Sequence, residues 1–306
     1  MDQTTQTTKK TDNDFIMSPK VDVCFAGLMN NPIVRKGFCA AILRVAPETI
    51  EKTELLPNNL PREHADDKLG IMDVRVRMMD KTQINMEMQV KGYGFWDERA
   101  MFYLCKMFSD QLKAGESYEK LKKSIHVSIL DFIHFPKDKR FYRRIGLCDR
   151  ETGKLYSDKL EIQVLELKKL PKEIKTGEDI VSWMHFFNGK SKEDFRRMAN
   201  GSIYLDEAYA ALKKLSADEY KRLEYEIREK ELRDRNWILN DAKRVGEKRG
   251  EKRGRKIGEK IGEKRGEKNG IELTKKVFKL YMQGKTEQDI ASECDIPVEK
   301  VREILE

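Results

Sequence analysis

Two short segments with alternating apolar and polar residues constrain the fold most strongly. Residues 71–78 and 83–90 carry apolar side chains at alternate positions, and a short polar connection separates them. Because successive side chains of a strand point to opposite faces, each segment has an apolar face for a core and a polar face. The pattern predicts a β-hairpin. Its polar faces carry Asp73, Arg75 and Arg77 on the first strand and Glu87, Gln89 and Lys91 on the second.

The pairing register of this hairpin decides whether its two acids can act together. In one register, Met78 pairs with Thr82 around a three-residue connection. Asp73 then lies opposite Glu87, and both carboxylates share a face. With a two-residue connection, Asp73 lies opposite Met88 and the carboxylates point to opposite faces. The first register also brings the apolar residues of both strands together, and we expect it.

Two carboxylates beside a cleft are suitable ligands for a hard divalent cation. Mg²⁺ takes oxygen ligands and keeps several of its waters, so two acids are enough to hold it. The alternative for these residues is an ordinary polar hairpin face in contact with solvent. The hairpin pattern alone leaves both interpretations open.

Further motifs along the chain resemble those of one protein family. They are Asp22-x-x-Phe25 with Phe38 to Leu43, Asp67-Lys68 before Met72-Asp73-Val74, Asn85-Met86-Glu87-Met88-Gln89, Arg99-x-x-x-Tyr103, Gln111-Leu112-x-x-Gly115-x-x-Tyr118, and Ile125 to Phe132. In this order and spacing, over residues 18–240, the chain resembles the PD-(D/E)XK nuclease family transposases, also called recombination-promoting nucleases. The Gly-rich run near the C-terminus also resembles the tails of that family.

The resemblance implies a restriction-endonuclease-like α/β core that hydrolyses phosphodiester bonds of DNA with a divalent cation, in DNA recombination or mobile elements. By position, Asp73, Glu87 and Gln89 would be catalytic. Asp73 and Glu87 would also be the ligands of Mg²⁺ or another divalent cation. The cation would lower the pKa of its bound water and neutralise charge on the phosphorane.

Gln89 stands where many PD-(D/E)XK enzymes have a lysine. Glutamine can position a water or a phosphate oxygen, but it carries no charge. Lys91 lies on the same strand face two residues further on and could supply that charge on DNA. A solvated lysine at the end of a strand is the alternative.

A helix predicted for residues 96–113 supplies two further candidates. Arg99, Tyr103, Lys106 and Asp110 share one face of it, and the apolar side carries Phe95, Met101, Phe102, Leu104 and Phe108. We expect Arg99 and Tyr103 to bind DNA, with Arg99 on a phosphate, or else to pair with nearby acids. Asp22 could be an auxiliary acid near the metal, but an N-cap of the following helix is the preferred interpretation.

The whole chain divides into five predicted regions. They are a disordered leader over residues 1–17, a nuclease-like core over 18–170, a helical lobe over 171–242, a basic arm over 243–270 and a helix-turn-helix-like module over 271–306. Within the core, the apolar patterns predict a helix over 22–43 and strands over 52–57, 124–132 and 160–168. Strands and helices in this order predict a mixed α/β fold.

Composition limits the protein's class. Charged residues make up 37% of the chain and hydrophobic residues 39%, which suits a core with a very polar surface. The five cysteines are odd in number and lack CxxC spacing, so we expect a reducing cytoplasm rather than disulfides or zinc. Cys24, Cys39 and Cys105 are expected in the core. No apolar run fits a membrane span and no P-loop or dinucleotide motif occurs, so neither a membrane nor a nucleotide cofactor is expected.

The basic arm has glycine at every fourth position from 246 to 270. Residues 243–270 hold twelve Lys or Arg against five Asp or Glu, a net +7 of the chain's +8. Each glycine costs a helix about 1 kcal/mol relative to alanine. We expect a mobile arm that touches DNA phosphates without reading sequence. A solvated spacer or a small-residue seam for helix pairing remains open.

The last residues resemble a helix-turn-helix. Thr286 and Asp289 have the spacing of a capping box, and Pro297 opens a second short helix. That second helix carries a weakly charged set of side chains, so a packing module that aids oligomerisation competes with a DNA reader. A nuclease that cuts both strands suits a homodimer. The alternative for the whole chain is a catalytically inactive DNA-binding or assembly protein that keeps the fold.

Overall fold

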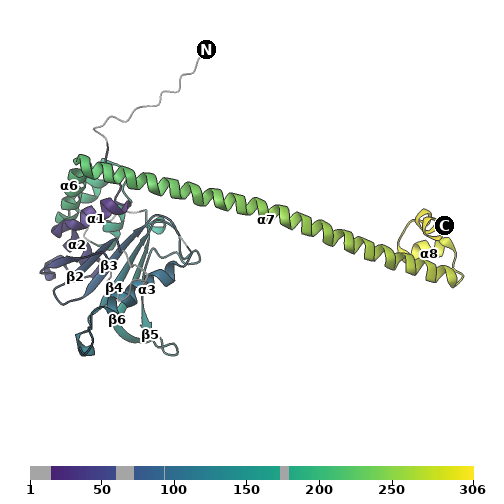
Figure 1. The fold of residues 1–306 in the computed structure, drawn as a ribbon, viewed down its shortest axis with the longest axis horizontal. Helices are drawn as coiled ribbons and strands as arrows, with labels where there is room; N and C mark the ends of the chain where they lie inside the picture. The colour runs from purple at the N-terminus through teal and green to yellow at the C-terminus, as the bar shows by residue number, and fades with distance from the viewer. Residues whose placement is uncertain (1–14, 60–71, 93, 173–178) are drawn as a thin grey trace, which may run out of the picture. The chain divides into compact units, whose positions relative to one another are not determined.

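The structure, a computed structural model, describes residues 15–59, 72–92, 94–172 and 179–306 (Figure 1). The chain divides into two compact units, one up to Glu231 and one from Leu232 onward. The helix α7 (Glu219–Met282) begins in the first unit and continues into the second. The motif Asp67-Lys68 lies outside the described residues.

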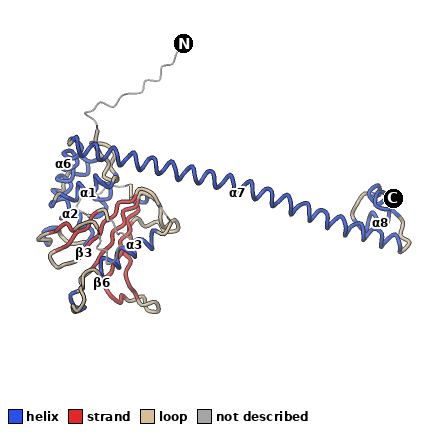
Figure 2. Tube along the Cα trace, in the orientation of Figure 1, coloured by secondary structure: helices blue, strands red, loops and turns tan. Residues whose placement is uncertain are grey.

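Within the described residues, six strands form one mixed sheet (Figure 2). They are β1 (Thr53–Leu56), β2 (Val74–Met78), β3 (Gln83–Gln89), β4 (Ser124–Leu130), β5 (Tyr142–Cys148) and β6 (Leu155–Glu166). Their order across the sheet is β1-β2-β3-β4-β6-β5, with β3, β4 and β6 parallel and the other neighbours antiparallel. The edge strand β5 was not predicted.

The hairpin of β2 and β3 has the expected register. Val74 pairs with Met86 and Arg77 with Gln83. The N–H of Met78 donates to the carbonyl of Thr82 at 2.8 Å, which closes the three-residue connection. The prediction that the apolar residues of the two strands share a face is therefore confirmed.

Helices cover both faces of the sheet. On β6, Ile162 packs with the cluster of α3 (Trp96–Ser109), whereas the next residue, Gln163, donates from Nε2 to the carbonyl of Ile42 at 3.2 Å. Ile42 belongs to α2 (Pro32–Leu43). Since neighbouring residues of a strand face opposite ways, α3 and α2 lie on opposite faces.

The α2 face is a thick helical layer that includes residues beyond 170. The helices α1 (Asp22–Asn30), α4 (Ile180–Asn188), α5 (Lys192–Ala199) and α6 (Ile203–Ala217) complete it. The rings of Phe38 and Phe187 lie 5.0 Å apart, and the rings of Phe38 and Trp183 lie 5.4 Å apart. These helices therefore pack with the core in one unit and do not form a lobe of their own.

Three local predictions are wrong. The expected single helix over 22–43 breaks at Asn31, whose side chain caps α2 while Pro32 occupies the first turn. Asp22 is not an N-cap, because it lies inside the first turn of α1. The expected leader ends too late, since Met17 is only 1% exposed and its N–H donates to Ser216 Oγ at 3.0 Å.

The apolar side of α3 also differs from the prediction. Its buried side chains are Trp96, Ala100, Tyr103, Leu104 and Met107. Phe95, Met101 and Phe102 are exposed instead, as is Cys105. Cys24 and Cys39 are buried as expected, and all five cysteines are unpaired.

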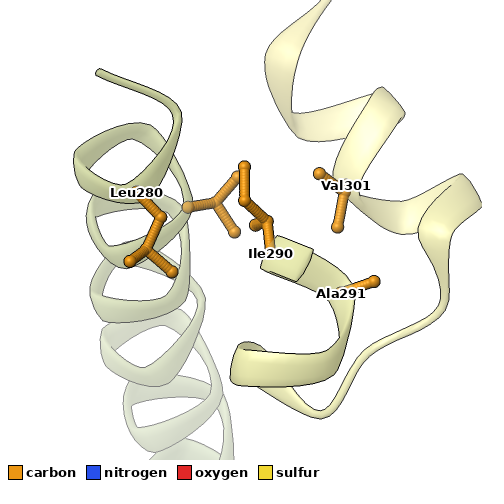
Figure 3. Close-up of a cluster of buried hydrophobic side chains, with 5 residues drawn as sticks. Leu280, Ile290, Ala291 and Val301 are labelled. Carbon is orange, nitrogen blue, oxygen red and sulfur yellow. The ribbon is translucent and has the colours of Figure 1, made fainter. Parts of the chain in front are cut away.

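The second unit has its own small core. α8 (Glu287–Cys294) and α9 (Val298–Leu305) pack against the end of α7 around Val277, Leu280, Ile290, Ala291 and Val301 (Figure 3). The capping box of Thr286 and Asp289 is confirmed. The glycine repeat of residues 246–270 lies inside α7 and is helical throughout. Among the helices of the described residues, none is long and apolar enough to cross a membrane.

Candidate active site

Glu87 lies near the carboxyl end of β3 and is 1% exposed. Its Oε1 accepts a hydrogen bond from Asn85 Nδ2 at 3.4 Å, and its Oε2 lies 3.6 Å from Arg99 Nε. Burial raises the pKa of Glu87 to about 7, and the charge of Asp73 adds to this, while Arg99 opposes it. An exposed polar hairpin face, the alternative to a functional site, is therefore excluded.

Asp73 directly precedes β2 and is half-buried. Its Oδ2 accepts a hydrogen bond from the N–H of Met88 at 2.9 Å. Burial raises the pKa of Asp73 to about 6, and the nearby charge of Asp22 raises it further. The bond from Met88 and the charges of Arg99 and Arg228 act in the opposite direction.

The structure brings the two predicted acids to one place. The β2–β3 register puts Asp73 opposite Glu87, and the negative charge of Asp73 contributes to the raised pKa of Glu87. Within the ranges that the structure describes, no three His, Cys, Asp or Glu side chains gather as a metal cluster. Two buried oxygen donors still fit Mg²⁺, which is commonly held by one or two carboxylates together with water and substrate phosphate.

Gln89 is the last residue of β3, two positions after Glu87, and Lys91 follows beyond the end of the strand. Gln89 is half-buried, and its Nε2 donates to the carbonyl of Lys91 at 3.1 Å. The amide is thereby turned toward the backbone that follows the strand. Lys91 is itself half-buried just beyond the end of β3.

Arg99 reaches the site from the first turns of α3. Its guanidinium lies over the ring of Tyr103 at 5.0 Å and near that of Trp96 at 5.7 Å. The side chain of Arg99 is 45% exposed, so it contacts both Glu87 and solvent. Tyr103 is buried beneath it and acts as a support for the guanidinium rather than as an open surface.

Two further residues lie near the site: Asp22, for which an auxiliary role near the metal was the less favoured interpretation, and Arg228, which the sequence analysis missed. Asp22 Oδ2 accepts a hydrogen bond from Arg228 Nε at 2.7 Å. Both charges influence the pKa of Asp73, so the pair lies beside the acids. The Asp22-x-x-Phe25 motif was the available signal for Asp22, whereas Arg228 lies in an uninformative charged helix of the sequence.

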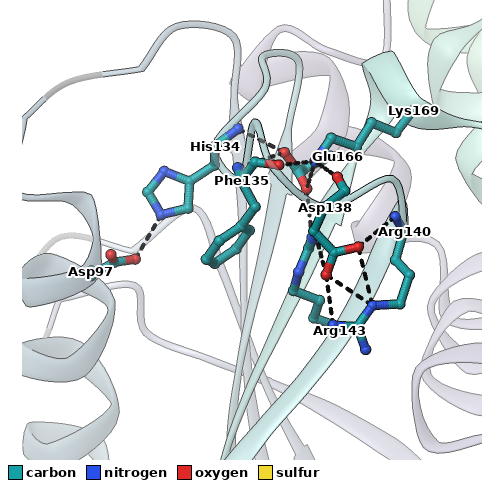
Figure 4. A network of polar contacts seen from close by, with 8 residues as sticks. All are labelled: Asp97, His134, Phe135, Asp138, Arg140, Arg143, Glu166 and Lys169. Carbon is teal, nitrogen blue, oxygen red and sulfur yellow. Dashed lines mark hydrogen bonds and ion pairs between the residues drawn. The ribbon is translucent and has the colours of Figure 1, made fainter.

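A polar network around the buried Glu166 connects the loop after β4 with the start of α3 (Figure 4). Glu166 accepts hydrogen bonds from the N–H groups of His134 at 2.7 Å and Phe135 at 3.0 Å, and it pairs with Lys169 at 2.8 Å. His134 Nε2 in turn lies 2.8 Å from Asp97 Oδ1 in the first turn of α3. This contact joins the loop after β4 to the helix end that carries Arg99.

Comparison with known proteins gives one match. A family model described as PD-(D/E)XK nuclease family transposase matches residues 19–242. The chain belongs to this family. No curated protein and no solved structure matches it.

Family membership agrees with the mixed six-stranded sheet and indicates a nuclease or transposase-associated role. The match includes both acids, Arg99 and the helices that cover the sheet. It ends before the glycine repeat, so residues 243–306 lie outside it.

Proposed function

We propose that the protein is a metal-dependent DNA endonuclease that hydrolyses phosphodiester bonds in DNA recombination or mobile-element processes. The observation that carries this proposal is the pairing of Asp73 and Glu87. Two acids on one sheet face, both with raised pKa, are costly to folding and serve well as ligands for a divalent cation.

Asp73 and Glu87 would hold Mg²⁺ or a similar cation through their carboxylate oxygens. The bound cation would supply an activated water and stabilise charge at the phosphorus. The bond from Met88 N–H leaves the second oxygen of Asp73 for this purpose. Gln89 would orient a water or a phosphate oxygen, and Lys91 would add charge nearby.

Arg99 is suited to bind the scissile phosphate. It has one weak contact to Glu87, a ring support in Tyr103 and a solvent-exposed side. A phosphate oxygen would replace Glu87 as its partner once the carboxylate is engaged elsewhere. Arg99 would then stabilise negative charge that develops during the attack.

The glycine repeat and the C-terminal module differ in charge, and this difference suggests a different role for each. The repeat of residues 243–270 carries net +7 on an exposed helix, whereas the module of residues 271–306 holds six Lys or Arg against eight Asp or Glu, a net −2. A module with a net negative charge gains no overall attraction to DNA phosphates, whereas the repeat does. We therefore assign DNA contact to the repeat and assembly, as a homodimer, to the module. Unpaired cysteines suit the cytoplasm.

One sequence feature favours a second candidate, a DNA-binding protein that has lost cleavage. Gln89 carries no positive charge where many PD-(D/E)XK enzymes have lysine. The two candidates are separated by incubating supercoiled plasmid with the protein or its Glu87→Ala variant, in Mg²⁺, Mn²⁺ or EDTA. Cation-dependent nicking by the wild type alone supports the endonuclease. Binding without nicking in either cation supports the second candidate.

A further inference from the structure

Beside Glu87, polar side chains that do not contribute to hydrophobic packing are buried on the face of the sheet that α3 covers. Asn85 and His126 face each other on β3 and β4 in the parallel register, and both are fully buried. Asn85 Nδ2 lies 3.4 Å from Glu87 Oε1 and 3.0 Å from His126 Nδ1. One amide group therefore bridges the acid and the imidazole.

The orientation of this amide is dictated by its neighbours. The ionised carboxylate that binds a cation can only accept hydrogen bonds, so the amide nitrogen of Asn85 is the atom that faces Glu87 in that state. The same nitrogen faces His126 Nδ1, which must then accept. The proton of the neutral imidazole is thereby placed on Nε2.

His126 cannot readily leave this arrangement. It is packed under α3, where its ring centroid lies 6.5 Å from that of Tyr103. Its Nε2 is buried and has no hydrogen-bond partner among the described residues, so the contact with Asn85 is the one that orients the ring. An unsatisfied buried polar group costs folding free energy, and its presence in a fold therefore points to a role other than stability.

The Glu87 carboxylate has two side-chain partners, one exposed and one enclosed. Arg99 is partly exposed, and it is the partner that a cation would displace. Asn85 is enclosed and stays in place. The carboxylate would otherwise rotate about its terminal torsion when Arg99 leaves, because that torsion has broad minima.

We propose that Asn85, itself fixed by His126, is a positioning residue that holds the Glu87 carboxylate in the orientation for cation binding. The proposal rests on the proposed function, in which Glu87 is a metal ligand. Residues that orient a ligand in this way typically contribute about 10- to 100-fold in metal affinity.

The test measures Mn²⁺ binding to the full chain by calorimetry, without DNA and without turnover. Asn85→Ala removes the bridge, and His126→Leu removes the acceptor at similar volume. Ser128→Ala is the matched control, because Ser128 is equally buried on the same face but has no hydrogen bond to Glu87 among the described residues. Glu87→Gln reports on the site itself.

We expect Mn²⁺ affinity to fall by about 10- to 100-fold in Asn85→Ala and His126→Leu, with the double variant no worse than Asn85→Ala. Ser128→Ala should bind as the wild type does, and DNA binding in EDTA should stay the same in all of them. Wild-type affinity in Asn85→Ala, or fully additive losses, would overturn the positioning role. If Glu87→Gln binds Mn²⁺ normally, the proposed function itself fails.

A variant that unfolds is recognised by its thermal melt. Asn85→Ser then replaces Asn85→Ala, because a hydroxyl is small and can donate to only one of the two partners. Reduced Mn²⁺ affinity in a folded Asn85→Ser protein supports the proposal, and unchanged affinity contradicts it.

Discussion

The backbone N–H of Met88 donates a hydrogen bond to Oδ2 of Asp73 at 2.9 Å. This bond ties an acid that lies just outside β2 to the residue after Glu87 on the neighbouring strand. Asp73 loses side-chain freedom before any ligand arrives. The two acids therefore form a pre-organised pair, whose geometry depends on a backbone donor rather than on a mobile side chain.

Metal-free protein should lose stability as pH rises, because the folded state holds protons on the two acids that the unfolded state releases. For Asp73 the loss runs from its ordinary pKa of 3.8 up to about 6, and for Glu87 from 4.5 up to about 7. Below these ranges the contribution is fully present. A pKa change of one unit in a carboxyl corresponds to about 1.4 kcal/mol of stability.

Thermal melts in EDTA at about pH 5 and about pH 8 measure this linkage. Glu87→Gln should raise Tm relative to the wild type at the higher pH and change it little at the lower pH. Glu98→Gln, on the exposed side of α3, is the control that should do neither. Equal effects of Glu87→Gln at both pH values would show that ionisation of this acid does not destabilise the fold.

Arg99→Ala should slow nicking by about 100-fold, as expected for a donor that stabilises transition-state charge. DNA affinity should change far less, because many phosphates contribute to binding. Arg196→Ala on α5 is the control, since that arginine is exposed and pairs with Glu193 away from the site. Single-turnover rates and binding curves check both. A parallel loss of binding and rate would assign Arg99 to binding alone.

Substitutions that remove positive charge should distinguish the contributions of the repeat and of the C-terminal module to DNA binding. The triple substitution Arg249→Gln, Lys252→Gln, Arg253→Gln should weaken DNA binding and lower the slope of its salt dependence by about one for each lost phosphate contact. Lys300→Gln with Arg302→Gln in α9 should leave both unchanged. Filter-binding titrations over a salt series measure the slopes, and the opposite pattern would make the module the DNA reader.

The same substitution at two glycines should have opposite effects. A Cβ on Gly37 of α2 would lie 2.6 Å from Tyr204 Cβ of α6, so Gly37→Ala should destabilise the first unit by about 2 kcal/mol or more. At Gly254, a Cβ meets nothing within 4 Å, so Gly254→Ala should strengthen the helix by about 1 kcal/mol. Denaturant unfolding and helical circular dichroism measure the two. A neutral Gly37→Ala would argue against α6 packing on the core.

The hairpin could be predicted from the sequence because its period and its register depend on local alternation. The apolar side chains within residues 71–90 permit one pairing that buries them together, and that pairing puts Asp73 opposite Glu87. From the hairpin pattern alone, the second strand's polar face could have been either solvent-exposed or part of a cleft. It is buried because α3 covers it, and such tertiary contacts leave no local signal.

Other parts depended on contacts between distant segments. The edge strand β5 reads Tyr-Arg-Arg-Ile-Gly-Leu-Cys, with no apolar alternation, and among the described strands it pairs with β6 alone. The side of α3 that faces the sheet was misjudged, since Phe95 at 81% exposure looked like a better core residue than Ala100. Asn85 and His126 look ordinary in the sequence, and their partnership exists because β3 and β4 run parallel in one register.

The central claim is that Asp73 and Glu87 hold a cation that cuts DNA. Asp73→Asn tests it most directly, because the amide oxygen can still accept the hydrogen bond from Met88 while the charge is lost. Plasmid nicking in Mg²⁺ and Mn²⁺ is measured beside DNA affinity in EDTA. We predict that the wild type nicks and that Asp73→Asn binds DNA equally but does not nick. Nicking by Asp73→Asn at the wild-type rate would contradict the account.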